Sequence, residues 1–204
     1  INQLRGLLSE FGFILPKGRN PAQAQIPDIL EDADHGLPAL VRRLLSDVHE
    51  RLLALNQGLL AYDRELEHLA KASEAAQRLT GIPGIGATTA TALLASIGDP
   101  GQFHNGRQWA AWLGLVPRQY TTGGVIRLGR ITKQGDKYLR TLLIHGTRAV
   151  LATVAEKTDK LSVWIKQLIE RRGYKRACVA LAAKNARIVW ALLTQHGEYQ
   201  RKAA

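Results

Sequence analysis

Residues 79–100 read LTGIPGIGATTATALLASIGDP, and they decide the local fold in the middle of the chain. Gly84 and Gly86 interrupt an apolar helical pattern, and a second pattern fills residues 87–97 before Gly98 ends it. Glycines in these places mark a tight turn and the end of a helix. The stretch therefore predicts two helices joined by a glycine turn, as in a helix-hairpin-helix motif.

Charge is distributed unevenly over the 204 residues, whose net charge is +11. Residues 1–80 hold nine basic and eleven acidic residues, whereas residues 81–204 hold nineteen and six, a net charge of +13. A basic region of this size indicates a polyanionic partner, most simply DNA or RNA. A basic surface that serves solubility alone is the alternative.

The glycine turn is a candidate contact for such a partner. Small residues let the backbone approach a phosphate, which the amides and the dipole of the following helix would favour. No Lys follows Gly86, so the turn is not a Walker A loop. The candidate DNA contacts in this segment are Gly84, Ile85, Gly86 and Thr88. Such hairpins also act as plain packing units, and that alternative stays open.

Residues 38–79 read as one long helix with apolar residues at alternating steps of four and three. The stripe consists of Val41, Leu45, Val48, Leu52, Leu55, Leu59, Tyr62, Leu66 and Leu69. This heptad pattern predicts a coiled coil. A helix of about 42 residues would be roughly 60 Å long, so we expect a partner helix from another copy, giving a homo-oligomer. Packing along other helices of the same chain is the alternative.

The remaining segments read mainly as helix, so the predicted fold class is all-α. Helical periodicity recurs in residues 1–15, 103–113, 136–155, 160–172 and 174–196. Residues 16–38 are punctuated by proline and glycine and read as a loop with at most a short helical turn. Residues 117–131 read as an exposed basic loop or hairpin. Trp109 and Trp112 are expected in the core.

Several classes of protein do not fit the composition. Cys178 is the one cysteine, which predicts a buried, inert thiol in a reducing cytoplasm. No apolar stretch of about 18 uninterrupted residues occurs, and the N-terminus carries no signal-peptide pattern, so we expect no membrane association. The sequence contains no Met and begins at Ile1, from which we expect a longer parent protein.

Metal ligands are scattered in the basic region. Its acidic residues are Asp99, Asp136, Glu156, Asp159, Glu170 and Glu198. Asp136 and Asp159 precede helical patterns and are expected to cap them. The six His residues are dispersed without zinc-ligand spacing, and His145 reads as a core or surface residue rather than a general base. We therefore expect no metal site here.

Two long blocks carry a family resemblance. They are LTGIPGIGATTATALLASIGDPGQF at residues 79–103 and AAWLGLVPRQYTTGGVIRLGRITKQGDKYLRTLLIHGTRAVL at residues 110–151, supported by INQLRGLLSEFG and ALAAKNARIVWALL nearer the two ends. Together they resemble the C-terminal part of DEDD-type insertion-sequence transposases, which are relatives of the Piv invertase and act as bridge-RNA-guided recombinases.

The resemblance implies a domain organisation. Residues 1–37 would be a linker and the end of a missing N-terminal RuvC-like domain, residues 38–79 the coiled coil, and residues 80–204 the helical transposase domain. The acidic quartet and its Mg²⁺ would belong to the RuvC-like domain. No cofactor is expected in the chain itself, which alone should be inactive.

The resemblance also implies a nucleophilic hydroxyl in the loop before the glycine pair. The family has a serine there, whereas this chain has Thr121 and Thr122, so either threonine is the candidate catalytic residue. Basic residues in and after the loop are candidate DNA contacts: Arg118, Arg127, Arg130, Lys133, Lys137 and Arg140.

The leading function is that of a transposase region that binds DNA and a guide RNA and contributes to DNA strand exchange. The location would be the bacterial cytoplasm, in association with the nucleoid. A non-catalytic helix-hairpin-helix DNA-binding protein that self-associates is the first alternative. A coiled-coil assembly module with incidental charge is the second.

Overall fold

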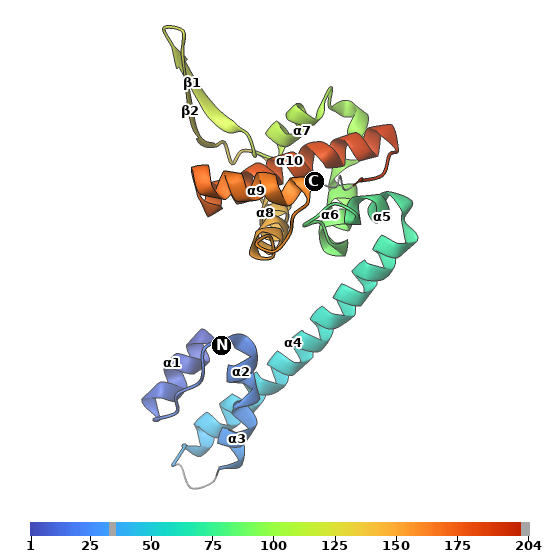
Figure 1. The fold of residues 1–204 in the computed structure, drawn as a ribbon. Helices are drawn as coiled ribbons and strands as arrows, with labels where there is room; N and C mark the ends of the chain where they lie inside the picture. The colour runs from blue at the N-terminus through green and yellow to red at the C-terminus, as the bar shows by residue number, and fades with distance from the viewer. Residues whose placement is uncertain (33–35, 201–204) are drawn as a thin grey trace. The chain divides into compact units, whose positions relative to one another are not determined.

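The computed structural model describes residues 1–32 and 36–200, which are mainly helical with one small two-stranded sheet (Figure 1). The predicted all-α fold class is thereby confirmed. The chain divides into two compact units, Ile1–Tyr62 and Asp63–Ala204. Residues 33–35 of the predicted linker and residues 201–204 of the predicted C-terminal domain lie outside the described residues.

The N-terminal unit is built from three short helices and the first part of a long one. The short helices are α1 (Asn2–Glu10), α2 (Arg19–Ala24) and α3 (Ile26–Glu31). The prediction of a loop over residues 16–38 is wrong for α2 and α3. Pro27 lies in the first turn of α3, where a helix does not need the missing N–H, so proline there does not exclude a helix.

The heptad stripe of the long helix α4 (Ala39–Ala72) has two environments. Leu45 is 2% exposed and shares a core with Leu8 and Ile26, against which Leu52 also packs. By contrast, Leu55 is 65% exposed. The first part of the stripe therefore packs within its own unit, as the alternative reading proposed, and the later part is open to solvent.

The helix predicted over residues 38–79 is broken at Ser73. Helix α4 ends at Ala72, and α5 (Glu74–Thr80) begins after Ser73, whose side chain accepts a hydrogen bond from the Ala76 amide. Serine at this N-cap position satisfies an amide that has no partner within the helix. The stripe gave no sign of the break because its last apolar member is Leu69.

The C-terminal unit is organised around α10 (Tyr174–Gln195), which packs against five other elements. These are α5, η1 (Pro100–Gln102), α7 (Gly106–Trp112), α8 (Lys137–Ala152) and α9 (Lys160–Arg172). Helix α6 (Ala87–Ile97) packs against α5 and α8. The side chains of Leu139, Leu143 and Val189 are fully buried between these helices.

Aromatic side chains contribute to this core on one side. Trp109 is 1% exposed, and its ring stacks on that of Trp112 with the centroids 5.0 Å apart. Phe103 meets both tryptophans edge-on. Trp112 is 39% exposed, so the expectation of a core position holds for Trp109 and only in part for Trp112.

The predicted helix caps and the buried thiol are confirmed. Asp136 accepts a hydrogen bond from the Leu139 amide at the start of α8, and Asp159 accepts one from the Ser162 amide at the start of α9. Cys178 is buried, and burial raises the pKa of its thiol. A neutral, enclosed thiol reacts slowly with electrophiles.

Helix α10 also has the length and mean hydropathy of a membrane-spanning helix, although polar residues interrupt its apolar stretches. Half of the most apolar 18-residue stretch of this helix is buried inside the unit, and the helix packs against five neighbouring elements. The central helix of a folded core has the same composition as a membrane span. Its apolar character is therefore explained by this packing.

Candidate nucleic-acid interface

The basic loop predicted at residues 117–131 is an antiparallel hairpin of β1 (Pro117–Thr122) and β2 (Val125–Ile131). Gly123 and Gly124, with φ values of 58° and 79°, form its two-residue turn. Positive φ at both turn residues matches the right-handed twist of the strands, and glycine adopts it without strain. The glycine pair therefore fixes both the length and the register of the hairpin.

The register assigns the hairpin side chains to two faces. Residues paired across the strands share a face, and neighbours along a strand alternate between faces. The pairs Tyr120–Arg127 and Thr122–Val125 place these four residues on what we call the Thr122 face. The opposite face carries the pairs Gln119–Leu128 and Thr121–Ile126.

Arg118 and Tyr120 extend the Thr122 face toward the base of the hairpin. Tyr120 covers Gly129, whose added Cβ would lie 3.2 Å from the tyrosine ring and 3.8 Å from the Arg118 Cβ. Arg130 lies next to Gly129 in a bulge opposite Arg118. The Thr122 face thus combines two guanidinium groups, an aromatic ring and a hydroxyl, as nucleic-acid surfaces do.

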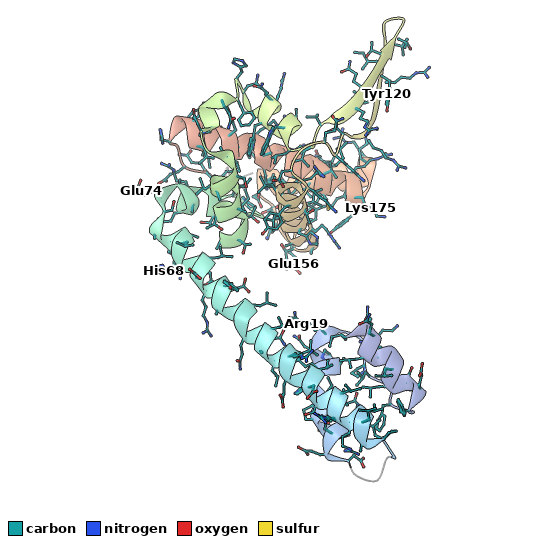
Figure 2. The ribbon with its side chains drawn as sticks, turned by 180° about the vertical axis from the view of Figure 1, so that it is seen from behind. Arg19, His68, Glu74, Tyr120, Glu156 and Lys175 are labelled. Atoms are coloured by element: carbon teal, nitrogen blue, oxygen red, sulfur yellow. The ribbon has the colours of Figure 1, made fainter. Side chains whose placement is uncertain are left out.

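The hairpin projects from the C-terminal unit, and Tyr120 marks its position in Figure 2. Every residue of both strands is exposed except Ile131, which is half-buried. Ile126 and Leu128 are 65% and 64% exposed on the face opposite Thr122. An isolated two-stranded hairpin is marginal in water, so this one depends on its base for a defined position.

The base is held by close backbone packing. A Cβ on Gly114 would lie 2.8 Å from the Gln134 amide nitrogen, and one on Gly135 would lie 3.0 Å from the Trp112 carbonyl carbon. The Thr132 amide donates to the Val116 carbonyl, and the Lys133 amide to the Gly114 carbonyl. These contacts join the hairpin to the end of α7 and the start of α8.

Arg140 belongs to this base rather than to the exposed surface. Its side chain is 9% exposed, and its guanidinium donates to the Leu113 carbonyl at 3.0 Å and the Asp136 carbonyl at 3.3 Å. The structure therefore gives Arg140 a structural role and corrects its reading as a DNA contact. Lys133 and Lys137, by contrast, are exposed.

The two candidate nucleophiles lie on opposite faces of the hairpin. The Thr121 hydroxyl accepts a hydrogen bond from the side-chain Nε2 of Gln119 at 2.9 Å. Thr122 lies directly before the glycine turn, on the face with Tyr120 and Arg127. Of the two threonines, only Thr122 shares a face with guanidinium groups that could neutralise a phosphate.

Much of the glycine turn at residues 81–86 serves packing. A Cβ on Gly84 would lie 2.9 Å from the Gly146 carbonyl carbon, so the two glycines bring the turn against α8. The Ile85 side chain is buried, and its amide donates to the Ile82 carbonyl. Asn185 of α10 is also buried and donates to the Pro83 carbonyl. Gly84 and Ile85 are thereby accounted for by packing.

The last residue of this turn faces open space. No atom lies within 4 Å of a Cβ built on Gly86, and α6 begins after it without a side-chain cap or an acidic residue in its first turn. Thr88 lies half-buried in that first turn. Gly86 is thus exposed and both Gly84 and Thr88 are half-buried, whereas Ile85 is buried.

The sequence reading missed an exposed basic cluster where α9 meets α10. Arg171, Arg172, Lys175 and Arg176 are all exposed there. Four cations within six residues are visible in the sequence, but they are divided between two predicted helices and were not considered together. In the described part of the chain, no group of three or more His, Cys, Asp or Glu side chains could hold a metal ion.

Comparison with known proteins adds independent information. The family model described as "Transposase IS116/IS110/IS902 family" matches residues 76–161. The chain is 48% identical over 200 residues to the transposase for insertion sequence element IS1111A of Coxiella burnetii, covering 98% of this chain and 55% of that protein. It is 46% identical over 200 residues to a probable family 20 transposase of Pseudomonas aeruginosa, covering 98% and 59%.

A further relative is the transposase for insertion sequence element IS1328 of Yersinia enterocolitica, 37% identical over 196 residues, which cover 95% of this chain and 57% of that protein. The chain thus spans between half and two thirds of the length of these curated relatives. The matched region contains α6, the hairpin and α8. Residues 76–161 therefore match the transposase model of the IS116/IS110/IS902 family, and the chain over nearly its whole length is similar to insertion-sequence transposases.

Proposed function

We propose that the chain is the C-terminal region of an insertion-sequence transposase and that its C-terminal unit binds DNA. The exposed hairpin is the observation that carries this proposal. One of its faces is basic and aromatic, its base is held by backbone packing, and every strand residue except Ile131 is exposed to solvent. The major groove of DNA admits a two-stranded β-ribbon. Arg118, Arg127 and Arg130 then contact phosphates, and Lys133 and Lys137 extend the contact toward α8.

Within this proposal, Thr122 supplies the nucleophile for strand exchange. Its hydroxyl oxygen attacks a DNA phosphorus, a phosphorus–oxygen bond to deoxyribose breaks, and the threonine proton leaves to a base while the departing oxygen gains a proton. Arg118 and Arg127, on the same face, would stabilise the added negative charge. No base is hydrogen-bonded to Thr122 in the described residues, so the chain alone is expected to be inactive.

The missing partners are those that the family resemblance implies. A RuvC-like domain with Mg²⁺ would complete the site, and a guide RNA would select the target. The exposed later part of the α4 stripe supports self-association through residues 38–79, so that another subunit's domain can meet the hairpin. Gly86 and Thr88 remain proposed phosphate contacts at the start of α6. The cytoplasm, near the nucleoid, is the proposed location.

Binding through the hairpin is tested by replacing Arg118 and Arg127 with Ala and measuring duplex-DNA affinity against salt concentration. Each lost phosphate contact should reduce the log–log slope by about 0.9, so the double variant should lose roughly two. Gln119→Ala together with Leu128→Ala alters the other face and serves as the control. An unchanged slope in the arginine variant would place the DNA contact elsewhere.

The nucleophile is tested in the full-length protein, with guide RNA, by looking for a covalent protein–DNA adduct. Thr122→Ala should abolish the adduct and Thr121→Ala should preserve it. Thr122→Ser should increase its yield, because removing the β-methyl frees the hydroxyl for in-line attack. An adduct that survives Thr122→Ala contradicts the assignment.

The alternative, a non-catalytic helix-hairpin-helix DNA-binding protein, is favoured by one observation: two helices flank the glycine turn, and Gly86 is open. It predicts DNA binding that depends on Gly86 and not on the hairpin arginines, and it predicts no adduct under any condition. The same two experiments therefore distinguish it from the transposase.

A further inference from the structure

Four cations meet at the junction of α9 and α10. We call Arg171, Arg172, Lys175 and Arg176 the basic turn; all four are exposed. None of them forms an ion pair with a carboxylate among the residues that the structure describes. Glu170 directly precedes them, so residues 170–176 carry four positive charges and one negative charge, a net charge of +3.

The backbone brings the four cations together. One residue, Gly173, separates α9 from α10, and its φ of 82° turns the chain sharply. Glycine reaches this conformation without the strain that a side chain would add. Because the connection is so short, the last turn of α9 and the first turn of α10, which carry these charges, are adjacent.

Tyr174 fixes this surface to the rest of the unit. Its hydroxyl donates to the Arg148 carbonyl of α8 at 3.2 Å, while 43% of the residue stays exposed. An exposed aromatic ring among cations offers a stacking surface beside phosphate-binding groups. Both elements of a nucleic-acid contact are therefore present within six residues.

Helix stability does not explain the second pair of cations. Arg171 and Arg172 lie in the last turn of α9, where the helix dipole favours positive charge. Lys175 and Arg176 lie in the first turn of α10, which has no acidic residue and no side-chain cap. Positive charge is unfavourable at that end, so these two residues reduce the stability of the helix that they begin.

We propose that the basic turn is a second nucleic-acid-binding surface, which holds the phosphodiester backbone of a strand through its four cations and stacks a base on Tyr174. In both views the turn, marked by Lys175 in Figure 2, lies at the end of the unit from which the hairpin projects. The hairpin would then hold one nucleic-acid segment and the basic turn another. The inference rests on the proposed function only in that the chain binds nucleic acid.

The test is a double charge reversal, Lys175→Glu with Arg176→Glu, in the full chain. The matched control is Lys17→Glu with Arg19→Glu, which changes the net charge equally at two exposed cations that flank Gly18 in the N-terminal unit. Fluorescence anisotropy with a duplex DNA and with a hairpin RNA, each at two salt concentrations, identifies which source of phosphates the surface takes.

The basic-turn variant should bind at least one of the two probes about tenfold more weakly than the control variant, because two phosphate contacts are lost. Its melting temperature should be unchanged or higher, since Glu is favoured in the first turn of a helix. Weaker binding in a variant that is at least as stable excludes unfolding as the cause. Loss confined to the RNA probe, or to the DNA probe, supports the proposal and identifies the ligand.

Equal affinities of the basic-turn and control variants for both probes would overturn this inference and leave the hairpin proposal intact. If the unmodified chain binds neither probe at low salt, the proposed function itself fails. As a further check, Tyr174→Phe keeps the ring and removes only its hydrogen bond to α8, so this variant should bind nucleic acid nearly as tightly as the unmodified chain. Tyr174→Ala removes the ring and should bind more weakly. Equal affinities of these two variants would contradict the stacking role.

Discussion

Arg140 has a different task from the other basic residues near the hairpin. Its guanidinium is buried and joins the end of α7 to the start of α8. Arg140→Met should destabilise the unit by about 2 kcal/mol, because a charged hydrogen bond is lost and a buried carbonyl loses its partner. Urea unfolding measures the change. The control is Lys137→Met, an exposed position one turn earlier, which should stay within roughly 0.5 kcal/mol of the unmodified chain. Equal effects of the two substitutions would contradict the structural role.

Gly146 and Gly86 form a second matched pair at the scale of single residues. A Cβ on Gly146 would collide with the Gly84 carbonyl oxygen, whereas one on Gly86 would meet no atom within 4 Å. Gly146→Ala must push the glycine turn away from α8 and should cost about 1–3 kcal/mol, as overpacking does. Gly86→Ala should be nearly neutral in the same unfolding experiment. A stable Gly146→Ala variant would show that the turn and α8 are not in close contact.

The sequence identified residues with a structural or binding role, but it did not indicate which of these roles each residue has. Gly84 and Gly86 both stood out in the pattern, but only the fold distinguishes the one that contacts Gly146 from the one that faces open space. Arg140 likewise looked the same as Lys137 in the sequence, one helical turn away. Long-range packing decides these roles, and no local pattern contains it.

Helix α4 gives a prediction at the scale of an element. Leu55 and Leu59 are 65% and 53% exposed, so Leu55→Asp with Leu59→Asp should leave the fold intact and disrupt an assembly that forms through this stripe. Light scattering at tens of micromolar, roughly the range in which modest coiled coils associate, measures the mass. Leu45→Asp is the contrasting variant: it should unfold the N-terminal unit, because Leu45 is only 2% exposed in its core. A monomeric unmodified chain would exclude self-association.

Elements with a long periodic pattern were predicted well. Helices α8, α9 and α10 begin where Asp136, Asp159 and the residue after Gly173 were expected to start them. The errors fell on short elements: α2 and α3 contain prolines that read as helix breakers, and Ser73 divides a stripe that looked continuous. The prolines of α2 and α3 are compatible with either a loop or the first turn of a helix, and Ser73 with either a continuous helix or a break. Tertiary contacts decide between these structures.

At the scale of the whole molecule, the chain separates a nearly neutral N-terminal part from a strongly basic C-terminal part. Residues 81–204 carry a net charge of +13, and the hairpin arginines and the basic turn belong to this region. From charge alone, the sequence predicts a polyanionic partner for this region. The sequence analysis did not single out the basic turn, because its four cations are divided between two predicted helices.

The central claim, that the C-terminal unit binds nucleic acid through its cations, is tested most directly by the salt dependence of duplex-DNA affinity. The measurement uses the unmodified full chain between about 50 and 200 mM salt. With six or more phosphates neutralised, the affinity should fall by about a thousandfold over this range. An affinity that stays constant across it would contradict the account.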